Sequence, residues 1–434
     1  MPRTNAYALV LTALLFLLCY AQITPISTAR NLGAVLETIH QKGLHSPSQK
    51  KLFGVAVSAM AESHDEHSSY IPPTNSDRYL RVLDQQLSGI GISVKKDTTT
   101  GDLFVQTPII GQPHPAYDAG MRTGDRIISV AGKPVRGHAL AEITTWIQGE
   151  QGTEVAIVVQ HADSEEAVPL RVKRAKIKVD SVLGVYRNGD TAWNFFLPSE
   201  PEIAYFQITD FGDLTITELR NALATMEGDN HIEGIIIDLR DNAGGYLSAA
   251  VDTCDLFLAS GNIVTTRGRG GSVRETFDAD PGGFWTEIPL VVLINGESAS
   301  ASEIFASCMQ DHQRATIVGN RSFGKGSVQQ MIPLPDGGLL KLTTASYHRP
   351  SGENIHRRRT MSEEEPWGVQ PDTGGEVSVT EEQEKARLDA RATQIAAPAV
   401  ASSPQNERAN EADPALQKSI EVLREKSESR RTAE

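Results

Sequence analysis

Cysteine is scarce in this chain, and its scarcity excludes two kinds of small module. Only 3 cysteines occur among 434 residues, too few for a disulfide scaffold or a cysteine-rich zinc module. Cys254 and Cys308 each lie among apolar residues at helical spacing, which predicts two buried thiols rather than a disulfide. Cys19 is not followed by a small residue, so we do not expect it to carry a lipid.

An excess of positive charge is also missing. Lys and Arg number 41 against 55 Asp and Glu, which gives a formal net charge of −14. An acidic chain is a poor partner for nucleic acid, so we expect no nucleic-acid partner. The 36 glycines and 22 prolines show no three-residue period, which excludes a collagen-like chain. A hydrophobic content of 39% indicates that part of the chain is polar and unstructured.

Long hydrophobic runs are absent except near the start of the chain, at Tyr7–Tyr20. Arg3 precedes this run, whose length suits a signal peptide and is marginal for a membrane-spanning helix. Small residues at Cys19 and Ala21 favour cleavage before Gln22 over an uncleaved anchor. Residues 1–28 are therefore expected to be a signal peptide or membrane anchor. Under either interpretation the remaining chain is expected to be exported, to the periplasm or the outer face of the cytoplasmic membrane.

Residues 29–87 are predicted to be a helical segment. Apolar residues recur there at intervals of three and four. They are Leu32, Val35, Leu36 and Ile39, then Leu52, Val55, Ala56 and Met60. The cluster His64–Asp65–Glu66–His67 could hold a metal ion. No further ligand follows at tight spacing and Pro72–Pro73 closes the segment, so a polar loop after a helix is preferred.

Residues 88–176 are predicted to be a small β domain. Short alternating apolar runs are separated by glycine-containing turns, with one short helix among them. Gly89–Ile92 and the run Pro115–Gly132 resemble a PDZ domain of the bacterial protease type. The resemblance implies that a peptide's C-terminus adds as an extra strand, its carboxylate held by the N–H groups of Gly89, Ile90, Gly91 and Ile92. A small β domain without a ligand is the alternative.

Residues 177–380 form the largest unit and carry an α/β pattern. Short apolar strands, of the kind buried on both faces, are predicted at 234–239, 290–294 and 315–318. Helical spacing follows the first two strands, and such alternation favours a largely parallel sheet. After Thr380 the chain becomes polar. Residues 381–434 are expected to be a mobile, low-complexity tail in which Asp413–Glu425 could form a last helix.

Three serines, Ser298, Ser300 and Ser302, lie between the second of these strands and its helix. Ser300–Ala301–Ser302–Glu303 is a capping-box pattern, so Ser300 could do no more than cap the helix. A serine at such a turn can also be a nucleophile, because the N–H groups and partial positive charge of the helix N-terminus stabilise an oxyanion. No G-x-S-x-G pattern surrounds Ser300, which argues against a lipase-type hydrolase.

A nucleophilic serine needs a base. His312 stands beside Asp311, but adjacent residues on a helix point apart, so Asp311 cannot orient His312 in a triad. Lys325 could act as the base if desolvation lowers its pKa from ~10.4 towards ~7. Its neighbours in sequence are not acidic, which suits that requirement.

The same lysine has a competing interpretation as part of a phosphate-binding loop. Gly319–Lys325 matches G-x-x-x-x-G-K. However, Gly326 stands where a magnesium-binding Ser or Thr is needed. Residues 328–332 then suit a strand rather than the required helix, so nucleotide binding is not preferred.

The runs S-A-S-A-S-E at 298–303 and S-F-G-K-G-S-V-Q at 322–329 together resemble the carboxyl-terminal processing proteases, serine peptidases with a Ser–Lys dyad. The resemblance covers residues 29–372. It implies a multidomain α/β chain, in which an α/β protease core of the ClpP/crotonase-like type carries an inserted PDZ domain and an N-terminal helical segment.

The resemblance also implies a role for several residues. Ser300 would be the nucleophile and Lys325 the general base, with Gln329 orienting the lysine. If 325–332 is a strand, Lys325 and Gln329 share one face. Ala301 and Gly245 would each offer a backbone N–H to the oxyanion. The resemblance implies no metal or organic cofactor.

Two departures from the family pattern stand out. Ala243 replaces a Pro or Gly, which is a minor change. Where the family usually continues from S-G-x-x-I into G-x-G-I-x-P-D, an insertion with a basic run at Arg357–Arg359 and an acidic run at Glu363–Glu365 follows Ser351–Ile355. A solvated loop is the default interpretation. A change to the substrate groove or an oligomer contact is the alternative.

The sequence therefore predicts a secreted or membrane-tethered serine endopeptidase that cleaves polypeptides recruited by their C-terminus. The alternative is a catalytically silent PDZ adaptor. The expected partners are polypeptide substrates and, if the N-terminal segment is uncleaved, the membrane. The sequence leaves it open whether the protein forms a homo-oligomer.

Overall fold

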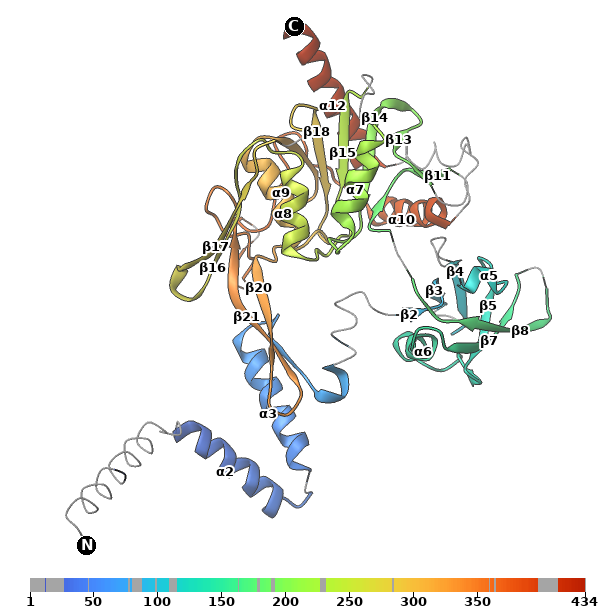
Figure 1. Ribbon diagram of the computed structural model, residues 1–434, viewed down its shortest axis with the longest axis vertical. Helices are drawn as coiled ribbons and strands as arrows, with labels where there is room; N and C mark the ends of the chain where they lie inside the picture. The colour runs from blue at the N-terminus through green and yellow to red at the C-terminus, as the bar shows by residue number, and fades with distance from the viewer. Residues whose placement is uncertain are drawn as a thin grey trace. The chain divides into compact units, whose positions relative to one another are not determined.

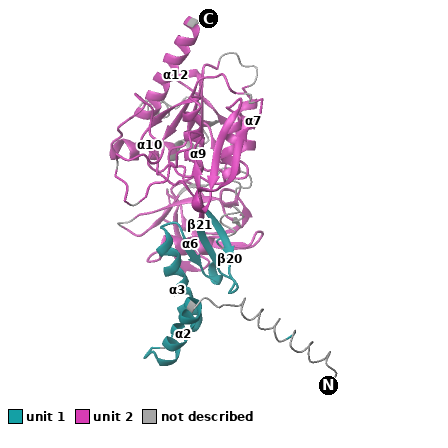
Figure 2. Cartoon of the chain, turned by 90° about the vertical axis from the view of Figure 1, so that its left-hand side faces the viewer, with its two compact units in different colours: residues 1–79, 329–343 teal, residues 80–328, 344–434 magenta. Residues whose placement is uncertain are grey.

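The structure is a computed structural model that describes fifteen stretches of the chain. They are Thr12 and residues 27–45, 47–76, 79, 88–97, 100–108, 115–162, 164–177, 180–188, 192–226, 232–282, 285–358, 360–362, 364–396 and 413–433. The chain forms two compact units, residues 1–79 with 329–343 and residues 80–328 with 344–434 (Figure 2). Apart from Thr12, the apolar run Tyr7–Tyr20 lies outside the described residues. In these stretches, no helix has both the length and the apolar character to cross a bilayer.

The first unit holds the N-terminal helices and a small antiparallel sheet. Its elements are α2 (Ser27–Lys42), α3 (Gln49–His64), β1 (Ser69–Ile71) and the parts of β20 (Ser327–Pro333) and β21 (Leu339–His348) within 329–343. Ile71 of β1 pairs with Leu339 of β21. The helical prediction for 29–87 therefore fails at Ser69, where a β-branched and aromatic run joins a sheet instead.

The polar cluster after α3 forms a turn. The Asp65 carboxylate accepts the backbone N–H groups of His67 and Ser68, at 2.8 and 2.7 Å. Within the part of the chain that the structure describes, no group of His, Cys, Asp and Glu side chains is arranged to hold a metal ion.

Residues 88–176 form a small β domain with its own core (Figure 1). Its elements are β2 (Ser88–Gly89), β3 (Ile92–Lys96), β4 (Leu103–Pro108), α5 (Pro115–Asp118), β5 (Arg126–Val130), β6 (Lys133–Pro134), α6 (Leu140–Ile147), β7 (Glu154–Gln160), β8 (Ala167–Lys173) and β9 (Ala175–Lys176). The main sheet has the order β3-β4-β5-β7-β8. Alternate residues such as Val155, Ile157 and Val159 are buried, as the period of a one-sided strand requires.

The core of the second unit is a largely parallel sheet with the order β10-β14-β15-β18-β19. Its strands are β10 (Val182–Leu183), β14 (Glu200–Ile208), β15 (Gly234–Asp238), β18 (Leu290–Ile294) and β19 (Ala315–Gly319), joined by α7 (Thr215–Ala224), α8 (Leu247–Asp255) and α9 (Ala301–Asp311). β13 (Phe196–Leu197) pairs with β14, and β11 (Tyr186–Asn188) with β12 (Ala192–Asn194). Strands β14, β15, β18 and β19 are parallel, so the predicted parallel sheet is confirmed.

Both faces of this sheet are covered, which explains why its strands are apolar throughout. Ile235 and Ile237 pack into the cluster that contains α8 and α9, whereas Ile236 packs into the cluster that contains α12 (Pro414–Ala433). Leu423 of α12 is 1% exposed. The expectation of a mobile, low-complexity tail is therefore wrong for 413–433, because this helix completes the core.

A second sheet region of this unit consists of β16 (Gly261–Arg267), β17 (Val273–Ala279) and the end of β21. A short 3₁₀ turn, η1 (Arg269–Gly271), joins β16 and β17. α10 (Glu381–Ala396) precedes the undescribed residues that lead to α12. Cys254 on α8 and Cys308 on α9 are free and buried, as predicted.

Candidate active site

Ser300 lies between β18 and α9, and only 7% of its surface is exposed. Its backbone angles are φ 56° and ψ −112°, whereas an ordinary N-cap residue is extended. A non-glycine residue at positive φ costs about 1–3 kcal/mol and persists only where its surroundings enforce it. Capping alone does not require this conformation, so the strain indicates a further role for Ser300.

The segment 295–300, which we call the serine turn, is fixed by the end of the neighbouring strand. The Asn242 carbonyl accepts the Ala299 N–H and the Ser302 hydroxyl, both at 2.9 Å. The Ser298 hydroxyl donates to the Leu239 carbonyl at 2.8 Å. All these groups come from the carboxyl ends of adjacent parallel strands, where α/β folds commonly place their sites.

Residues 239–245, the glycine turn, pack directly against Ser300. A Cβ on Gly244 would lie 2.7 Å from Ser300 Cβ and 3.0 Å from the Ala301 nitrogen, so glycine is required there. Gly245 has φ 148°, and a Cβ on it would approach the Phe211 carbonyl oxygen to 2.3 Å. The structure thus brings Ser300 and Ala301 next to Gly244, whereas the atoms nearest to a Cβ on Gly245 belong to Phe211.

Residues 320–326, the lysine turn, are tied to the serine turn by a buried carboxylate. Glu303 Oε2 accepts the backbone N–H groups of Ser300 and Lys325, both at 2.8 Å. Its Oε1 accepts the Gly324 N–H and the Ser322 hydroxyl, both at 2.6 Å. Burial raises the pKa of Glu303, and these four hydrogen bonds oppose that shift. Because all four partners donate, the geometry suits the ionised carboxylate.

The insertion packs on the lysine turn. The Arg357 N–H donates to the Gly324 carbonyl at 2.8 Å, and the Arg321 and Arg357 guanidinium groups lie 3.9 and 4.2 Å from the centre of the Trp367 ring. Trp367 is buried, whereas Arg357 and Arg358 are exposed. The default expectation of a solvated loop is therefore wrong for Trp367 but agrees with the exposure of Arg357 and Arg358.

Lys325 is half-buried and precedes β20, which begins two residues later than the predicted strand. Gln329 lies on β20, and its amide nitrogen donates to Thr343 Oγ1 at 3.3 Å. A strand follows the G-K pattern, as predicted. A phosphate-binding loop needs a helix at this point, so its structural context is missing.

Sequence reasoning missed three residues of this site. The sequence presents Glu303 only as part of a capping box, and it assigns no role to Asn242. Tyr347 on β21 is 8% exposed, and its backbone N–H donates to the carbonyl of Gly326 in the lysine turn at 2.9 Å. A carboxylate among the small and apolar residues of α9 was a usable signal for Glu303. Nothing in the sequence separates Tyr347 from an ordinary strand aromatic.

The four candidate residues of the β domain lie between β2 and β3. Gly89 is on β2, Ile90 is buried, Gly91 has a left-handed φ of 71°, and Ile92 starts β3. The Ile90 carbonyl accepts the Ala116 N–H at 2.9 Å. β3 is at the end of the sheet order, so among the described strands it pairs only with β4. An edge strand next to such a loop suits the addition of a peptide strand.

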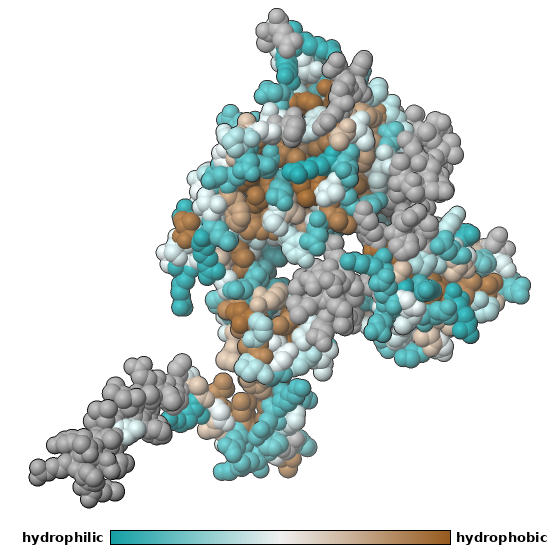
Figure 3. All heavy atoms as spheres, in the orientation of Figure 1, coloured by the Kyte–Doolittle hydropathy of each residue, from teal (hydrophilic) through white to brown (hydrophobic). Residues whose placement is uncertain are grey.

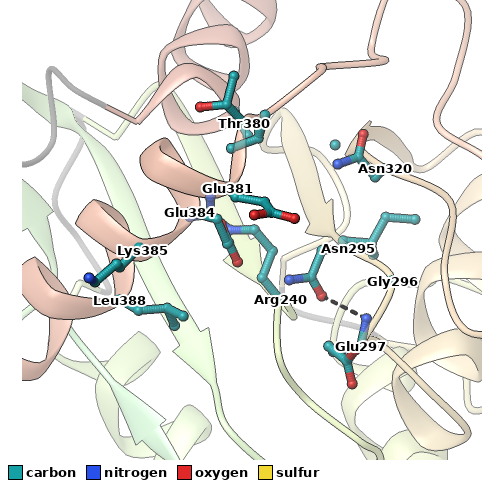
Figure 4. A pocket seen from close by; sticks show the side chains of 14 residues that line it. Arg240, Asn295, Gly296, Glu297, Asn320, Thr380, Glu381, Glu384, Lys385 and Leu388 are labelled. Atoms are coloured by element: carbon teal, nitrogen blue, oxygen red, sulfur yellow. Dashed lines mark hydrogen bonds between the residues drawn. The ribbon is translucent and has the colours of Figure 1, made fainter. Parts of the chain in front are cut away.

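A pocket of 470 Å³ opens at the carboxyl ends of β18 and β19. It is lined by Arg240, Ile294, Asn295, Gly296, Glu297, Gly319, Asn320, Val379, Thr380, Glu381, Glu384, Lys385, Leu388 and Ala415 (Figure 4). None of these residues is one of the candidate catalytic residues, so this pocket is separate from the candidate active site.

A buried ion network lies beneath that pocket. The Arg240 guanidinium donates to the Asp238 carboxylate at 2.7 Å and to the Asp413 carboxylate at 2.8 Å. Burial acts to raise the pKa of Asp238, but the charge and hydrogen bonds of Arg240, together with the charge of Arg387, outweigh burial and lower it. Arg387 of α10 pairs with Asp241 of the glycine turn. The helices after residue 380 are thus connected to the glycine turn.

The profile of peptidase family S41 matches residues 202–374, and that of the PDZ domain matches residues 112–161. The carboxy-terminal-processing protease of Bartonella bacilliformis is 36% identical over 326 residues, which are 74% of this chain and 71% of that protein. The carboxyl-terminal-processing protease of Synechocystis is 33% identical over 64% of this chain and 62% of its own length. The solved structure of a photosystem II D1 C-terminal processing protease is 26% identical, covers 79% of this chain and 85% of that chain, and has a TM-score of 0.47.

A mixed α/β core, an inserted PDZ domain and N-terminal helices define the fold class. The chain belongs to peptidase family S41, as a C-terminal processing serine protease with a PDZ domain.

Proposed function

We propose that this protein is an endopeptidase that uses Ser300 and Lys325 to cleave polypeptides recruited by their C-terminus. The observation that supports it most strongly is the strained Ser300 turn, tied to the backbone of Lys325 through Glu303. Two chain segments that carry a nucleophile and a base share one buried carboxylate. Such rigid positioning serves a reaction between the two side chains.

The proposed reaction has two halves. Neutral Lys325 takes the Ser300 proton while the Ser300 oxygen attacks the peptide carbonyl, and the lysine ammonium then protonates the leaving amine. The N–H groups of Gly245 and Ala301 stabilise the oxyanion. Because Asn242 Oδ1 accepts the Gly244 N–H at 2.8 Å, Gly245 is the better donor of the glycine pair. Water releases the acyl group, and Gln329 orients the lysine, as the family resemblance implies.

Peptidase activity of Ser300→Ala and Lys325→Ala tests this dyad. Ser307→Ala is the matched control, since Ser307 is a buried serine on the same helix whose hydroxyl donates only within the helix. Both dyad variants should lose activity and the control should keep it. Undiminished cleavage by both variants would refute the dyad. A wild-type protein that binds peptides but cleaves none would favour the PDZ adaptor instead.

A lysine base also predicts a pH dependence. Activity should rise with pH as Lys325 loses its proton, because only the neutral amine can accept the proton of Ser300. A flat profile between about pH 6 and 9 would argue against a lysine base. Product C-termini, compared by proteomics between wild type and Ser300→Ala, would identify the natural substrates.

We further propose that the PDZ domain binds the free C-terminus of the substrate along β3, with the backbone of Gly89–Ile92 facing the carboxylate. A peptide with a free carboxylate should bind more tightly than its amidated form. Gly91→Ala should weaken binding, because Gly91 needs φ 71°. Gly132→Ala is the control, since Gly132 has φ 76° in open space. Equal binding of both peptides would refute carboxylate recognition.

Export is the remaining part of the proposal, with the periplasm or the outer face of the cytoplasmic membrane as its destination. It is supported by the apolar run Tyr7–Tyr20 in the sequence. N-terminal sequencing of the cellular protein should begin at Gln22 if the signal is cleaved, and membrane fractionation identifies an uncleaved anchor. Retention of the full chain in the cytoplasm would contradict export.

Self-association is proposed through the first unit. Val35 of α2 and Val55 and Met60 of α3 are between 51% and 62% exposed, and hydrophobic side chains are visible around these helices in Figure 3. A second copy would cover them. Light scattering should then give a mass above one chain, and Val35→Asp should lower it; a monomer at all concentrations would refute the proposal.

A further inference from the structure

Asp241, the third residue of the glycine turn, has a strained backbone conformation with a φ of 62°. Among the residues that the structure describes, only three other non-glycine residues have a positive φ, and one of them is Ser300. Such a conformation persists where the surroundings enforce it, although Asp adopts it more readily than most residues. The contacts that hold Asp241 in this conformation therefore indicate what its turn is held against.

Asp241 and Asn295 form a reciprocal pair of hydrogen bonds. The Asp241 N–H donates to Asn295 Oδ1 at 3.0 Å, and Asn295 Nδ2 donates to Asp241 Oδ1 at 2.9 Å. The two bonds close a ring between the glycine turn and the first residue of the serine turn. Asn295 Oδ1 also accepts the Glu297 N–H at 3.1 Å, the bond drawn as a dashed line in Figure 4. One side-chain amide thus binds the backbone of both turns.

Arg387 of α10 completes the arrangement. Its guanidinium, 9% exposed, pairs with Asp241 Oδ2 at 2.5 Å, and its Nε donates to the Glu384 carboxylate at 2.9 Å. Asp241 therefore offers one carboxylate oxygen to Arg387 and the other to Asn295. Every donor in this set faces an acceptor, which favours a single orientation of the Asp241 and Asn295 side chains.

We propose that Asp241 and Asn295 are positioning residues for the oxyanion hole. They lock the glycine turn, which carries the proposed donor Gly245, onto the serine turn, which carries Ser300 and Ala301. Both side chains act through the backbone of the two turns, so a broken pair moves one oxyanion donor relative to the nucleophile. Small displacements of this kind reduce the rate of the chemical step. The proposal rests on the oxyanion role proposed above for these two N–H groups.

Exchange of the two side chains tests the pair. Asp241→Asn alone places an amide NH₂ against the Asn295 amide or against Arg387, so a donor faces a donor. Asn295→Asp alone brings two carboxylates together. Each single variant should lower kcat about 10-fold and leave KM for β-casein unchanged. The double variant, Asp241→Asn with Asn295→Asp, again places donors opposite acceptors, so its kcat should return to within about 3-fold of wild type.

Two further measurements separate positioning of the oxyanion hole from a general loss of structure. The pH midpoint of kcat should stay at the wild-type value in the single variants, because Lys325 is untouched. A fluorophosphonate should label them about 10-fold more slowly, since charge develops on its phosphoryl oxygen as Ser300 Oγ attacks phosphorus and fluoride leaves. Asp278→Asn is the matched control: Asn262 Nδ2 donates to Asp278 Oδ1 at 3.0 Å between β16 and β17, and its loss should leave kcat unchanged.

The outcomes distinguish this role from the dyad. Wild-type kcat and labelling in both single variants, with or without a lower unfolding temperature, would overturn positioning by the pair. A double variant no more active than the slower single variant would also overturn it. If the single variants do not fold, Asp241→Gly removes the side chain and suits a φ of 62°, so wild-type kcat in that variant would overturn the role. Labelling of Ser300→Ala at the wild-type rate would refute the dyad instead.

Discussion

The serine turn and the lysine turn meet at one carboxylate but are held in place by different means. The serine turn is fixed by groups at the ends of the parallel strands, such as the carbonyls of Leu239 and Asn242. The lysine turn is bound to the serine turn by the Phe323 N–H, which donates to the Ser298 carbonyl at 3.0 Å, and it also packs against a later segment that carries Arg357 and Trp367. The comparison teaches that the nucleophile is positioned by the sheet itself, whereas the position of the base depends in addition on an added peripheral segment.

The largest effect is expected from the group that both turns share. In Glu303→Gln the amide NH₂ would face backbone donors at either oxygen position, so at least one N–H group would lose its acceptor inside the core. We expect kcat/KM to fall by about 10²–10³-fold, a loss comparable to that of an oxyanion donor. Steady-state kinetics with thermal unfolding measures it.

Ser322→Ala is the matched control for this change. It removes only one of the four hydrogen bonds to the carboxylate and should cost much less activity. Near-normal turnover in Glu303→Gln would show that the two turns hold their positions without the carboxylate.

The serine turn alone should be broken by Gly244→Ala. The new Cβ would lie 2.7 Å from Ser300 Cβ, and Gly244 has φ 108°, so both the backbone and the nucleophile must shift. A displacement of this size is expected to reduce kcat about 10²-fold. Gly270→Ala, at φ 73° in open space, should have no effect on activity. Full activity of Gly244→Ala would mean that the glycine turn is not part of the site.

The lysine turn alone should be loosened by Trp367→Ala. This change removes a ring 6% exposed and both guanidinium contacts, so the free energy of unfolding should fall by about 3 kcal/mol. We expect kcat to fall as well, because the cavity lies next to Gly324. Trp285→Ala removes another buried ring, away from both turns, and should lower stability without lowering kcat of the folded protein. Equal kinetics in the two variants would contradict a positioning role for the insertion.

The smallest effect is expected at the far end of α9. Arg349 and the Ser351 N–H bind the Asp311 carboxylate; burial acts to raise its pKa, but these bonds outweigh burial and lower it below the usual 3.8. A carboxyl whose pKa is lower when folded stabilises the protein above its unfolded pKa and loses that contribution as pH falls. The stability lost in Asp311→Asn, about 1–2 kcal/mol at pH 7, should therefore shrink below about pH 4. Chemical denaturation at several pH values measures it, and a difference that grows in acid would contradict this pairing.

The parts of the fold that follow from local periodicity were predictable. Strands 234–239, 290–294 and 315–318 are mostly apolar runs because both of their faces are buried. A last helix was expected at Asp413–Glu425, but the packing of α12 on the sheet was not, because this helix buries only a narrow stripe including Leu416, Ile420 and Leu423 within a polar sequence. A stripe of that width is easily hidden by a strongly polar average composition.

In the candidate site, too, some residues could be predicted from the local sequence and others could not. Ser300 and Lys325 stand in runs whose residue types point to their chemistry. Glu303 was visible but ambiguous, since a capping box accounts for it equally well. The contacts of Asn242, Trp367 and Tyr347 join segments far apart in the chain, so no local pattern could reveal them.

The position of α12 also sets an order of events during synthesis. Ribosomes make a chain from its N-terminus, and residues 413–433 follow every candidate catalytic residue. Until they are made, Ile236 and Val291 lack the cover that Leu416, Ile420 and Leu423 give to their side of the sheet, and Arg240 lacks the Asp413 carboxylate. A nascent chain that already contains Ser300 and Lys325 therefore has to wait for this helix before its core can close.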